Sequence, residues 1–389
     1  MTPLLSLILI FLIAYLGSLI YKKFESSSPW ISAFVYSGSI HIVIGYLLGP
    51  HSTGLLTDKI IGQLNVLVGL VLGWTGFLIG LQAKRSELKR FQKSYYLFAS
   101  LNFIIMLVGF GVVVFTIIKV FKIYIEDSHA SMLIIIGAVS SPILIAVLKK
   151  SLKLRGKLIH FLQFSVALDN MFGILLFGFS LILFNKFFND NQSLWIASGI
   201  SLVFSISLAF LFYKLSKGIK NQQQYFLILI GFLLIIVGVA LNLNISLLFI
   251  SFVFGVTLAN LPISTRNLYL SISNAEKPMY FLMLIFTGAC INEITPMLIF
   301  YLFLFVLVRV GLKYIAGSIS VFSIIESERP NSRIGFTHLG MGGVALAMAL
   351  DYHLSIATDI SHAILFIISG AVILNDIISI KLSRVVLNK

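Results

Sequence analysis

Charged side chains are scarce in this sequence, and their scarcity excludes most soluble proteins. Asp, Glu, Lys and Arg make up 11% of the 389 residues, whereas hydrophobic residues make up 59%. Soluble domains carry roughly a quarter charged residues. The single cysteine excludes an internal disulfide framework. The sequence also lacks a nucleophile–base pattern, a metal-ligand cluster and a phosphate-binding loop, so it predicts neither an enzyme nor a cofactor.

Long apolar runs are what the sequence has in abundance. Most are about 20 residues long, as a helix needs to cross roughly 30 Å of hydrocarbon, and they lack the alternation of a barrel strand. We therefore expect an all-α membrane protein with about thirteen transmembrane helices. These form one domain over residues 1–389, without a soluble regulatory domain. The predicted helices are 2–21, 30–49, 61–83, 95–118, 131–148, 158–184, 193–213, 224–242, 245–262, 278–292, 296–321, 333–350 and 361–381.

The net charge of +14 reflects membrane topology rather than a nucleic-acid ligand. With the N-terminus outside and the helices alternating in direction, 22 of the 28 Lys and Arg residues fall on the cytoplasmic side. Four fall on the opposite side: Lys59, Lys119, Lys122 and Lys186. The positive-inside rule explains this asymmetry. We expect a multi-pass protein of the inner (cytoplasmic) membrane, with its N-terminus outside and its C-terminus in the cytoplasm.

Four charged side chains remain at membrane depth: Asp169, Arg309, Lys313 and Asp376. Each charge there costs at least ~2.5–3.5 kcal/mol on insertion scales, so such residues face a partner or a water-filled path. Arg309 and Lys313 are four residues apart and share one helix face. The simplest neutral arrangement pairs Asp169 with Lys313 and Asp376 with Arg309. A purely structural ion pair is the alternative, above all for Arg309 and Asp376.

Two of the predicted helices contain residues that interrupt a helix. Pro142 lacks an N–H and frees backbone carbonyls, and the preceding Ser140 and Ser141 can bond backbone or an ion. The second interrupted helix, 333–350, contains several glycines near the same depth. We expect the break at Gly340, Gly342 and Gly343.

The two interruptions fall at corresponding positions of the chain. If 193–213 is a linker, the helices before and after it form two inverted halves of six, and the interrupted helix is the fifth of each half. Interrupted helices at matching positions of inverted halves point to a transporter's binding site. Packing by small residues is the alternative interpretation.

Several segments, in their order and spacing, resemble one known family. They are GYLLGP (45–50), GLVLGWTGFLIGLQAKRSELKR (69–90), AVSSP (138–142), ISFVFGVTLAN (250–260), RVGLKYIAGSI (309–319), GMGGVALAMAL (340–350) and LNDIISIKLSR (374–384). The sequence is similar to the monovalent cation:proton antiporters, specifically their Kef-type and NapA-like branch. This resemblance implies a fold of two inverted repeats with crossed discontinuous helices, as in NhaA and NapA.

The resemblance further implies two lobes and a function. A core lobe of about 94–185 and 296–385 would move against a dimerisation and scaffold lobe of about 1–93 and 191–292. The protein would be a homodimer that exchanges Na⁺ or K⁺ for H⁺ by alternating access.

The resemblance also suggests which residues bind the ion. Related antiporters carry Asp-Asp or Asn-Asp in the sixth helix, whereas this chain has Asp169 followed by Asn170. Our hypothesis makes Asp169 the carrier of Na⁺ or K⁺ and of the proton, and Lys313 its counter-ion. Asn170, Ser140 and Ser141 would supply neutral oxygen ligands. Three alternatives remain. One is an uncoupled or channel-like transporter, and another is a non-transporting sensor paralogue, which the missing second acid allows. The third is an organic-anion symporter that uses Arg309 and the positive ends of the half-helices.

Overall fold

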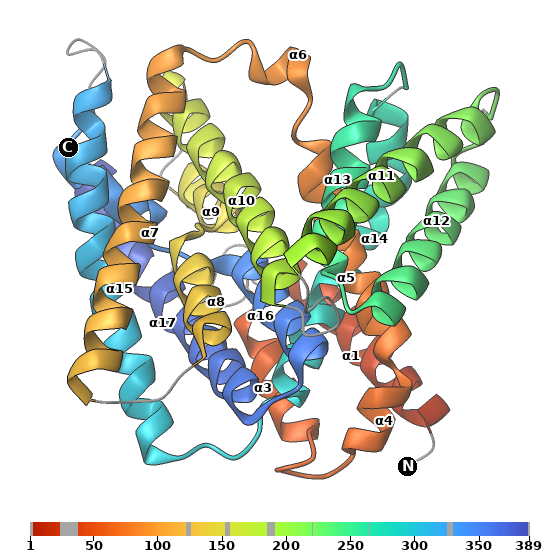
Figure 1. The fold of residues 1–389 in the computed structure, drawn as a ribbon, viewed down its shortest axis with the longest axis horizontal. Helices are drawn as coiled ribbons and strands as arrows, with labels where there is room; N and C mark the ends of the chain where they lie inside the picture. Colours follow the sequence, from red (N-terminus) through yellow and green to blue (C-terminus); the bar gives the residue numbers. More distant parts are fainter. Residues whose placement is uncertain are drawn as a thin grey trace.

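The computed structural model of this chain consists of packed helices (Figure 1). It describes residues 3–23, 38–121, 126–151, 156–184, 191–219, 221–263, 265–324 and 330–387. Within these ranges there are helices and no β-strand, so the predicted all-α fold is confirmed. The first part of the predicted helix 30–49 lies outside the described residues.

One group of helices, on the left of Figure 1, comes from the middle and the end of the chain. We call it the core group. Its elements are α7 (Lys93–Phe121), α8 (Asp127–Ala138), α9 (Pro142–Ser151), α10 (Lys157–Phe184), α15 (Pro296–Ser320), η3 (Val321–Ser323), η5 (Ser332–His338), α16 (Gly342–Ile356) and α17 (Asp359–Leu387).

The second group, on the right of Figure 1, is called the scaffold group. Its elements are α1 (Pro3–Lys23), α3 (Ser39–Leu48), α4 (Asp58–Gln63), α5 (Asn65–Leu81), α11 (Asn191–Ser216), α12 (Gln222–Leu243), α13 (Leu247–Asn260) and α14 (Thr265–Ala289). The short helix α6 (Arg85–Leu88) lies in the connection between the groups. The division into a core lobe and a dimerisation lobe, and the relative motion of the two, stay predictions.

Helix lengths agree with a membrane protein. Seven described helical segments are long and apolar enough to cross a membrane, and the bent pair η5–α16 makes an eighth. Helices α3, α5 and α13 are apolar but shorter. The predicted number of about thirteen crossings therefore stays a prediction.

Helix α14 differs most from the sequence prediction. The apolar run predicted a helix over 278–292, whereas the helix begins at Thr265 and passes through Pro278. The hydropathy pattern marks only apolar residues, and the first half of α14 is polar, including Glu276 and Lys277. A helix can continue beyond its apolar part because its backbone bonds are internal.

The core group contains the same three-helix arrangement twice, in opposite directions. In each set a broken helix lies between two long ones: α8–α9 between α7 and α10, and η5–α16 between α15 and α17. Helices α7 and α10 run downward in Figure 1, whereas α15 and α17 run upward. The predicted inversion is therefore visible in the core group.

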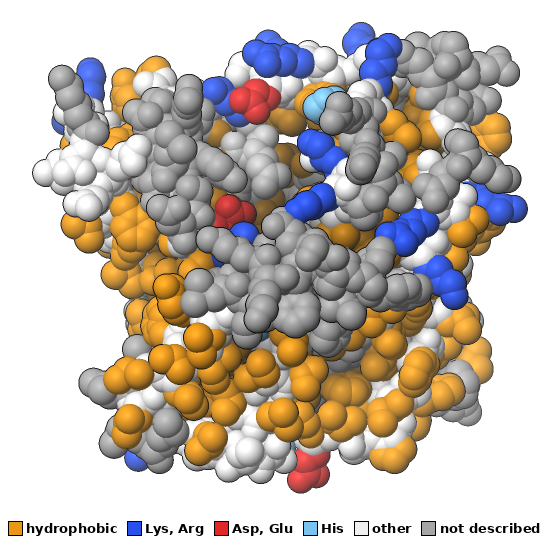
Figure 2. Space-filling model, turned by 180° about the vertical axis from the view of Figure 1, so that it is seen from behind, with side chains coloured by type: hydrophobic (Ala, Val, Ile, Leu, Met, Phe, Trp, Pro, Cys, Tyr) orange, Lys and Arg blue, Asp and Glu red, His pale blue; other side chains and the backbone are white. Residues whose placement is uncertain are grey.

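The charged surface and the chain ends define two sides of the molecule. Seen from behind, Lys and Arg gather over the upper half, and the lower half is mostly hydrophobic (Figure 2). The chain starts at the lower side and ends at the upper side (Figure 1). This placement agrees with an odd number of crossings.

Backbone-to-backbone packing holds the scaffold group together. On α5, a side chain at Gly76 or Gly80 would collide with the backbone of α13, and one at Gly255 of α13 would collide with the backbone of α5. Small residues allow this close approach, which is the usual way that membrane helices associate. The scaffold group thus contains a tight α5–α13 contact.

Candidate functional site

The two broken helices of the core group touch each other at their unwound segments. Helix α9 begins at Pro142, where the missing N–H needs no partner. The N–H of Ser141 donates to the carbonyl of Gly340 at 2.8 Å, which joins the two breaks directly. Gly342, at the start of α16, has φ +63°, a conformation that favours glycine, and a side chain there would collide with Ser141. We call this place the crossing.

Asp169 of α10 and Lys313 of α15 meet beside the crossing. Both side chains are fully buried, and Lys313 Nζ lies 3.7 Å from Asp169 Oδ2. Lys313 Nζ also donates to the carbonyl of Ala138 at 3.0 Å and to Ser140 Oγ at 2.9 Å. Ser140 Oγ in turn donates to Asp169 Oδ2 at 2.7 Å. The structure thus forms the predicted Asp169–Lys313 pair, with Ser140 bonded to both partners.

Arg309 binds the backbone of both breaks. Its fully buried guanidinium donates to the carbonyls of Gly137 and Val139, the latter at 2.5 Å, on one side. On the other side it donates to Leu339 at 3.2 Å and to Gly340 at 3.4 Å. Helix ends leave carbonyls without an intrahelical partner. The five-donor fork of arginine therefore satisfies carbonyls that the two breaks expose.

Asp376 of α17 does not form the predicted ion pair with Arg309. Its Oδ1 accepts the N–H of Met341 at 3.3 Å, just before α16 begins. A carboxylate near the start of a helix is favourable because the helix dipole is positive there. The predicted direct pairing was wrong because carbonyls exposed at the breaks compete for the guanidinium.

The remaining predicted site residues lie in three different settings. The Asn170 side chain is buried, and neither its oxygen nor its nitrogen has a hydrogen-bond partner among the described residues. Ser141 Oγ accepts the N–H of Leu144 at 3.3 Å, so it caps α9 rather than facing Asp169. Gly343 lies against the ring of Tyr280 from α14, where a side chain would collide.

Sequence reasoning missed Asn102, which belongs to the same site. This fully buried residue of α7 donates from Nδ2 to Asp169 Oδ2 at 3.4 Å. The feature of the sequence that could have indicated Asn102 is its polar amide side chain inside the apolar run 95–118.

Sequence reasoning also missed Asp351, which was placed beyond the end of the predicted helix 333–350. Helix α16 continues to Ile356, and Asp351 is fully buried. Its carboxylate accepts bonds from Ser246 Oγ at 2.6 Å and from the N–H groups of Leu247 and Leu248 at 3.2 and 3.1 Å. Asp351 therefore links the core group to the first turn of α13 in the scaffold group.

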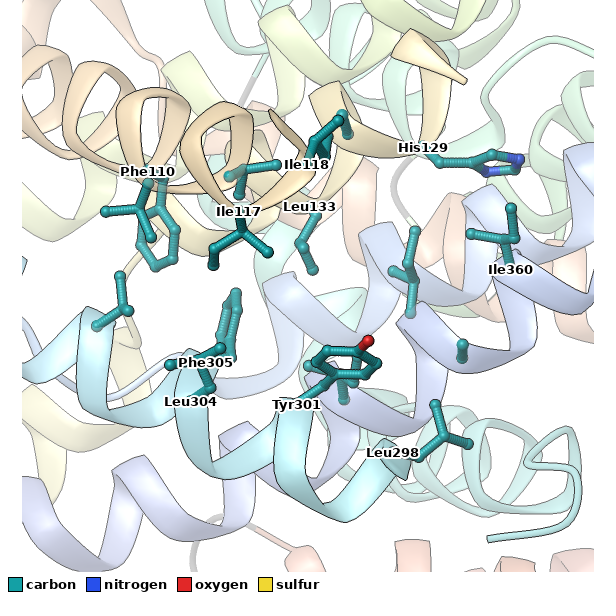
Figure 3. Close-up of a pocket in the computed structure, with 17 residues that line it drawn as sticks. Phe110, Ile117, Ile118, His129, Leu133, Leu298, Tyr301, Leu304, Phe305 and Ile360 are labelled. Carbon is teal, nitrogen blue, oxygen red and sulfur yellow. The ribbon is translucent and has the colours of Figure 1, made fainter. Parts of the chain in front are cut away.

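An apolar cleft of about 350 Å³ lies elsewhere in the core group (Figure 3). Residues of α7, α8, α15 and α17 line it, including Phe110 and Phe305, and its few polar groups include His129 and the hydroxyl of Tyr301. None of the four buried charges predicted at membrane depth lines this cleft. The cleft is separate from the charged site at the crossing.

Comparison with known proteins agrees with this architecture. The family described as sodium/hydrogen exchanger, transmembrane, matches residues 8–386. The chain belongs to the sodium/hydrogen exchanger family. The predicted resemblance to monovalent cation:proton antiporters is thereby confirmed, and the exchanger is a membrane transporter. No curated protein matches the sequence.

Two solved structures share the exchanger's fold. The sodium proton antiporter MjNhaP1 from Methanocaldococcus jannaschii at pH 8 superposes with a TM-score of 0.70 and 17% identity, covering 99% of this chain and 98% of that one. An electron-microscopy structure of the same antiporter superposes with a TM-score of 0.62 and 18% identity, covering 99% of this chain and 97% of that one. The likeness shows that the antiporter fold extends over the whole exchanger.

Proposed function

We propose that this exchanger moves Na⁺ or K⁺ in one direction and H⁺ in the other, and that the cation and the protonated Lys313 compete for Asp169. One observation carries the proposal. Asp169 is fully buried beside the crossing, receives all its hydrogen bonds on Oδ2, and has no partner for Oδ1 among the described residues. Ionisable residues inside a membrane are costly and mark ion or proton pathways.

The cation step follows from the chemistry of oxygen ligands. Hard cations such as Na⁺ and K⁺ bind carboxylate, carbonyl and hydroxyl oxygens. A cation at Asp169 Oδ1 takes further ligands from the Asn170 amide, the Ser140 hydroxyl and carbonyls near Ser141. The cation displaces the Lys313 ammonium from Asp169.

The proton step follows from the displaced lysine. An ammonium left without its carboxylate inside the membrane is an unpaired buried charge, and release of its proton removes that charge. When Lys313 takes up a proton and returns to Asp169, the cation leaves. One cation is thus exchanged for one proton, and the net charge of the site stays the same.

Transport also requires that the site open to each side in turn. We assign the moving part to the core lobe, about 94–185 and 296–385, and the static dimer-forming part to about 1–93 and 191–292. The basic side of the molecule, where the chain ends, faces the cytoplasm under the positive-inside rule. The N-terminus is then outside the cytoplasmic membrane.

The test is proton flux in proteoliposomes that contain a trapped pH dye. Addition of Na⁺ or K⁺ outside should move protons outward in the wild type, and Asp169→Asn should abolish this signal. Glu87→Gln, an exposed residue of α6, is the matched control and should transport normally. Wild-type flux in Asp169→Asn would refute the role of Asp169.

One observation favours a second function, transport of a cation without proton coupling. Asn170 stands where antiporters with this resemblance carry the ion-binding carboxylate, and its amide cannot take up a proton. The same vesicles separate the two functions. Cation uptake without any pH change would support the uncoupled transporter and overturn the exchange reaction.

A further inference from the structure

The site contains one more polar side chain that the proposed reaction does not use. Asn102 comes from α7, which supplies none of the predicted site residues. Its side chain is fully buried, and its Nδ2 donates to Asp169 Oδ2. Its own oxygen, Oδ1, has no hydrogen-bond partner among the described residues.

The donors around Asp169 are distributed unevenly. Ser140 and Asn102 donate to Oδ2, and the Lys313 ammonium also lies nearest to that oxygen. Asp169 Oδ1 is left without a partner, as are the amide oxygens of Asn102 and Asn170. Buried polar atoms are almost always bonded, so the unbonded oxygens of Asp169, of its neighbour Asn102 and of the following residue Asn170 require an explanation.

Asn260 is an example of an amide whose role is structural. Asn260 of α13 donates to the carbonyls of Ala83 and Val256, and its oxygen accepts the N–H of Arg85 at 2.8 Å. Its acceptor and one donor bond hold the segment from Ala83 to Arg85 against α13, and the other donor bond lies within α13. Asn102 uses a donor and leaves its acceptor free, which is unfavourable for a residue that serves packing alone.

We infer that Asn102 is a third neutral ligand for the transported cation and sets the exchanger's cation preference. The inference rests on the proposed function of Asp169. The Nδ2 group orients the carboxylate so that Oδ1 points away from Lys313, and the amide Oδ1 completes an oxygen shell with Asp169 and Asn170. An amide oxygen binds the cation without adding charge, so the one-for-one exchange is unaffected.

The experiment measures cation dependence in Asn102 variants. Asn102→Ala removes the ligand, and we expect the half-saturating Na⁺ concentration for proton flux to rise about tenfold or more. The maximal rate should change less than this. Asn102→Asp supplies a charged oxygen instead and should alter the relative response to Li⁺, Na⁺ and K⁺. Asn242→Ala, in α12 of the scaffold group, is the matched control because its amide donates to Gly238 outside the site.

A second measurement keeps the inference independent of transport. The purified exchanger is heated in detergent with and without Na⁺, and the cation-induced rise in melting temperature is recorded. We expect Asn102→Ala and Asn102→Ser to need higher Na⁺ for the same rise.

The outcomes separate the two claims. A water site without a cation role predicts unchanged half-saturation and unchanged cation ranking in folded Asn102 variants, and that result would overturn the inference. If the wild type shows no cation-driven proton flux but its Na⁺-dependent stabilisation shifts with Asn102, the exchange reaction fails and the ligand assignment stands.

Discussion

The α5–α13 contact of the scaffold group and the crossing of the core group join helices in opposite ways. In the first, glycines let two unbroken helices meet backbone to backbone, without charged groups. In the second, two broken helices meet where their exposed carbonyls accept four hydrogen bonds from Arg309, beside a buried ion pair. Close packing needs only small residues, whereas the crossing needs specific side chains to satisfy its backbone. The polar contact is the one where we propose that the ion binds.

Removal of Arg309 should have the largest effect of the predictions that test this comparison. Arg309→Leu leaves buried carbonyls on both breaks without a donor, each costing about 1–3 kcal/mol. We expect a loss of at least about 3 kcal/mol in stability. Thermal unfolding in detergent, followed by size-exclusion chromatography, measures it. Arg333→Leu, at an exposed position of η5, should unfold like the wild type. Equal melting of both variants would mean that Arg309 does not hold the crossing.

A methyl group in the scaffold contact should have an intermediate effect. The added Cβ of Gly76→Ala would collide with the carbonyl of Leu248 and force α5 and α13 apart, at a cost of about 1–3 kcal/mol. Gly231→Ala on α12 meets nothing within 4 Å and should stabilise the helix by about 0.5–1 kcal/mol. The same thermal assay compares them. We expect Gly76→Ala to lower the melting temperature and Gly231→Ala to raise it. A shift of both in the same direction would contradict the comparison.

Neutralisation of Asp351 should have the smallest effect. Asp351→Asn keeps the shape of the side chain but removes the charge from the start of α13, which we expect to cost up to about 2 kcal/mol. Hydrogen exchange of the Leu247 and Leu248 amides measures the loss locally. Asp359→Asn, at the exposed start of α17, is the control and should change stability less. Unchanged exchange at α13 would show that the charge contributes nothing there.

The sequence allowed much of the crossing to be predicted. Pro142 and the glycines near 340 mark breaks because proline and glycine weaken helices by known local mechanisms. Charges in apolar runs are rare enough that Asp169 and Lys313 could be paired by elimination. Both features depend on residue type and position alone.

The rest of the site depends on three-dimensional proximity. The sequence does not distinguish Asn102 from Asn242, because an amide in an apolar run reveals neither its depth nor its neighbours. Arg309 was paired with Asp376 because the freed carbonyls of the breaks are backbone atoms, which residue identity does not locate. Asp351 was missed because the apolar run predicted a helix that ends at residue 350, whereas α16 continues to Ile356.

The lone cysteine makes this exchanger convenient for measurement. Cys290 is buried, and its carbonyl accepts a bond from His362, where the scaffold group meets α17. Thiol reagents act on exposed thiolates, so the native chain should give little background labelling. Single cysteines introduced at exposed sites on the core and scaffold groups could therefore carry spectroscopic probes without prior removal of the native thiol. Distances between such probes would report directly whether the two groups slide past each other when Na⁺ is added.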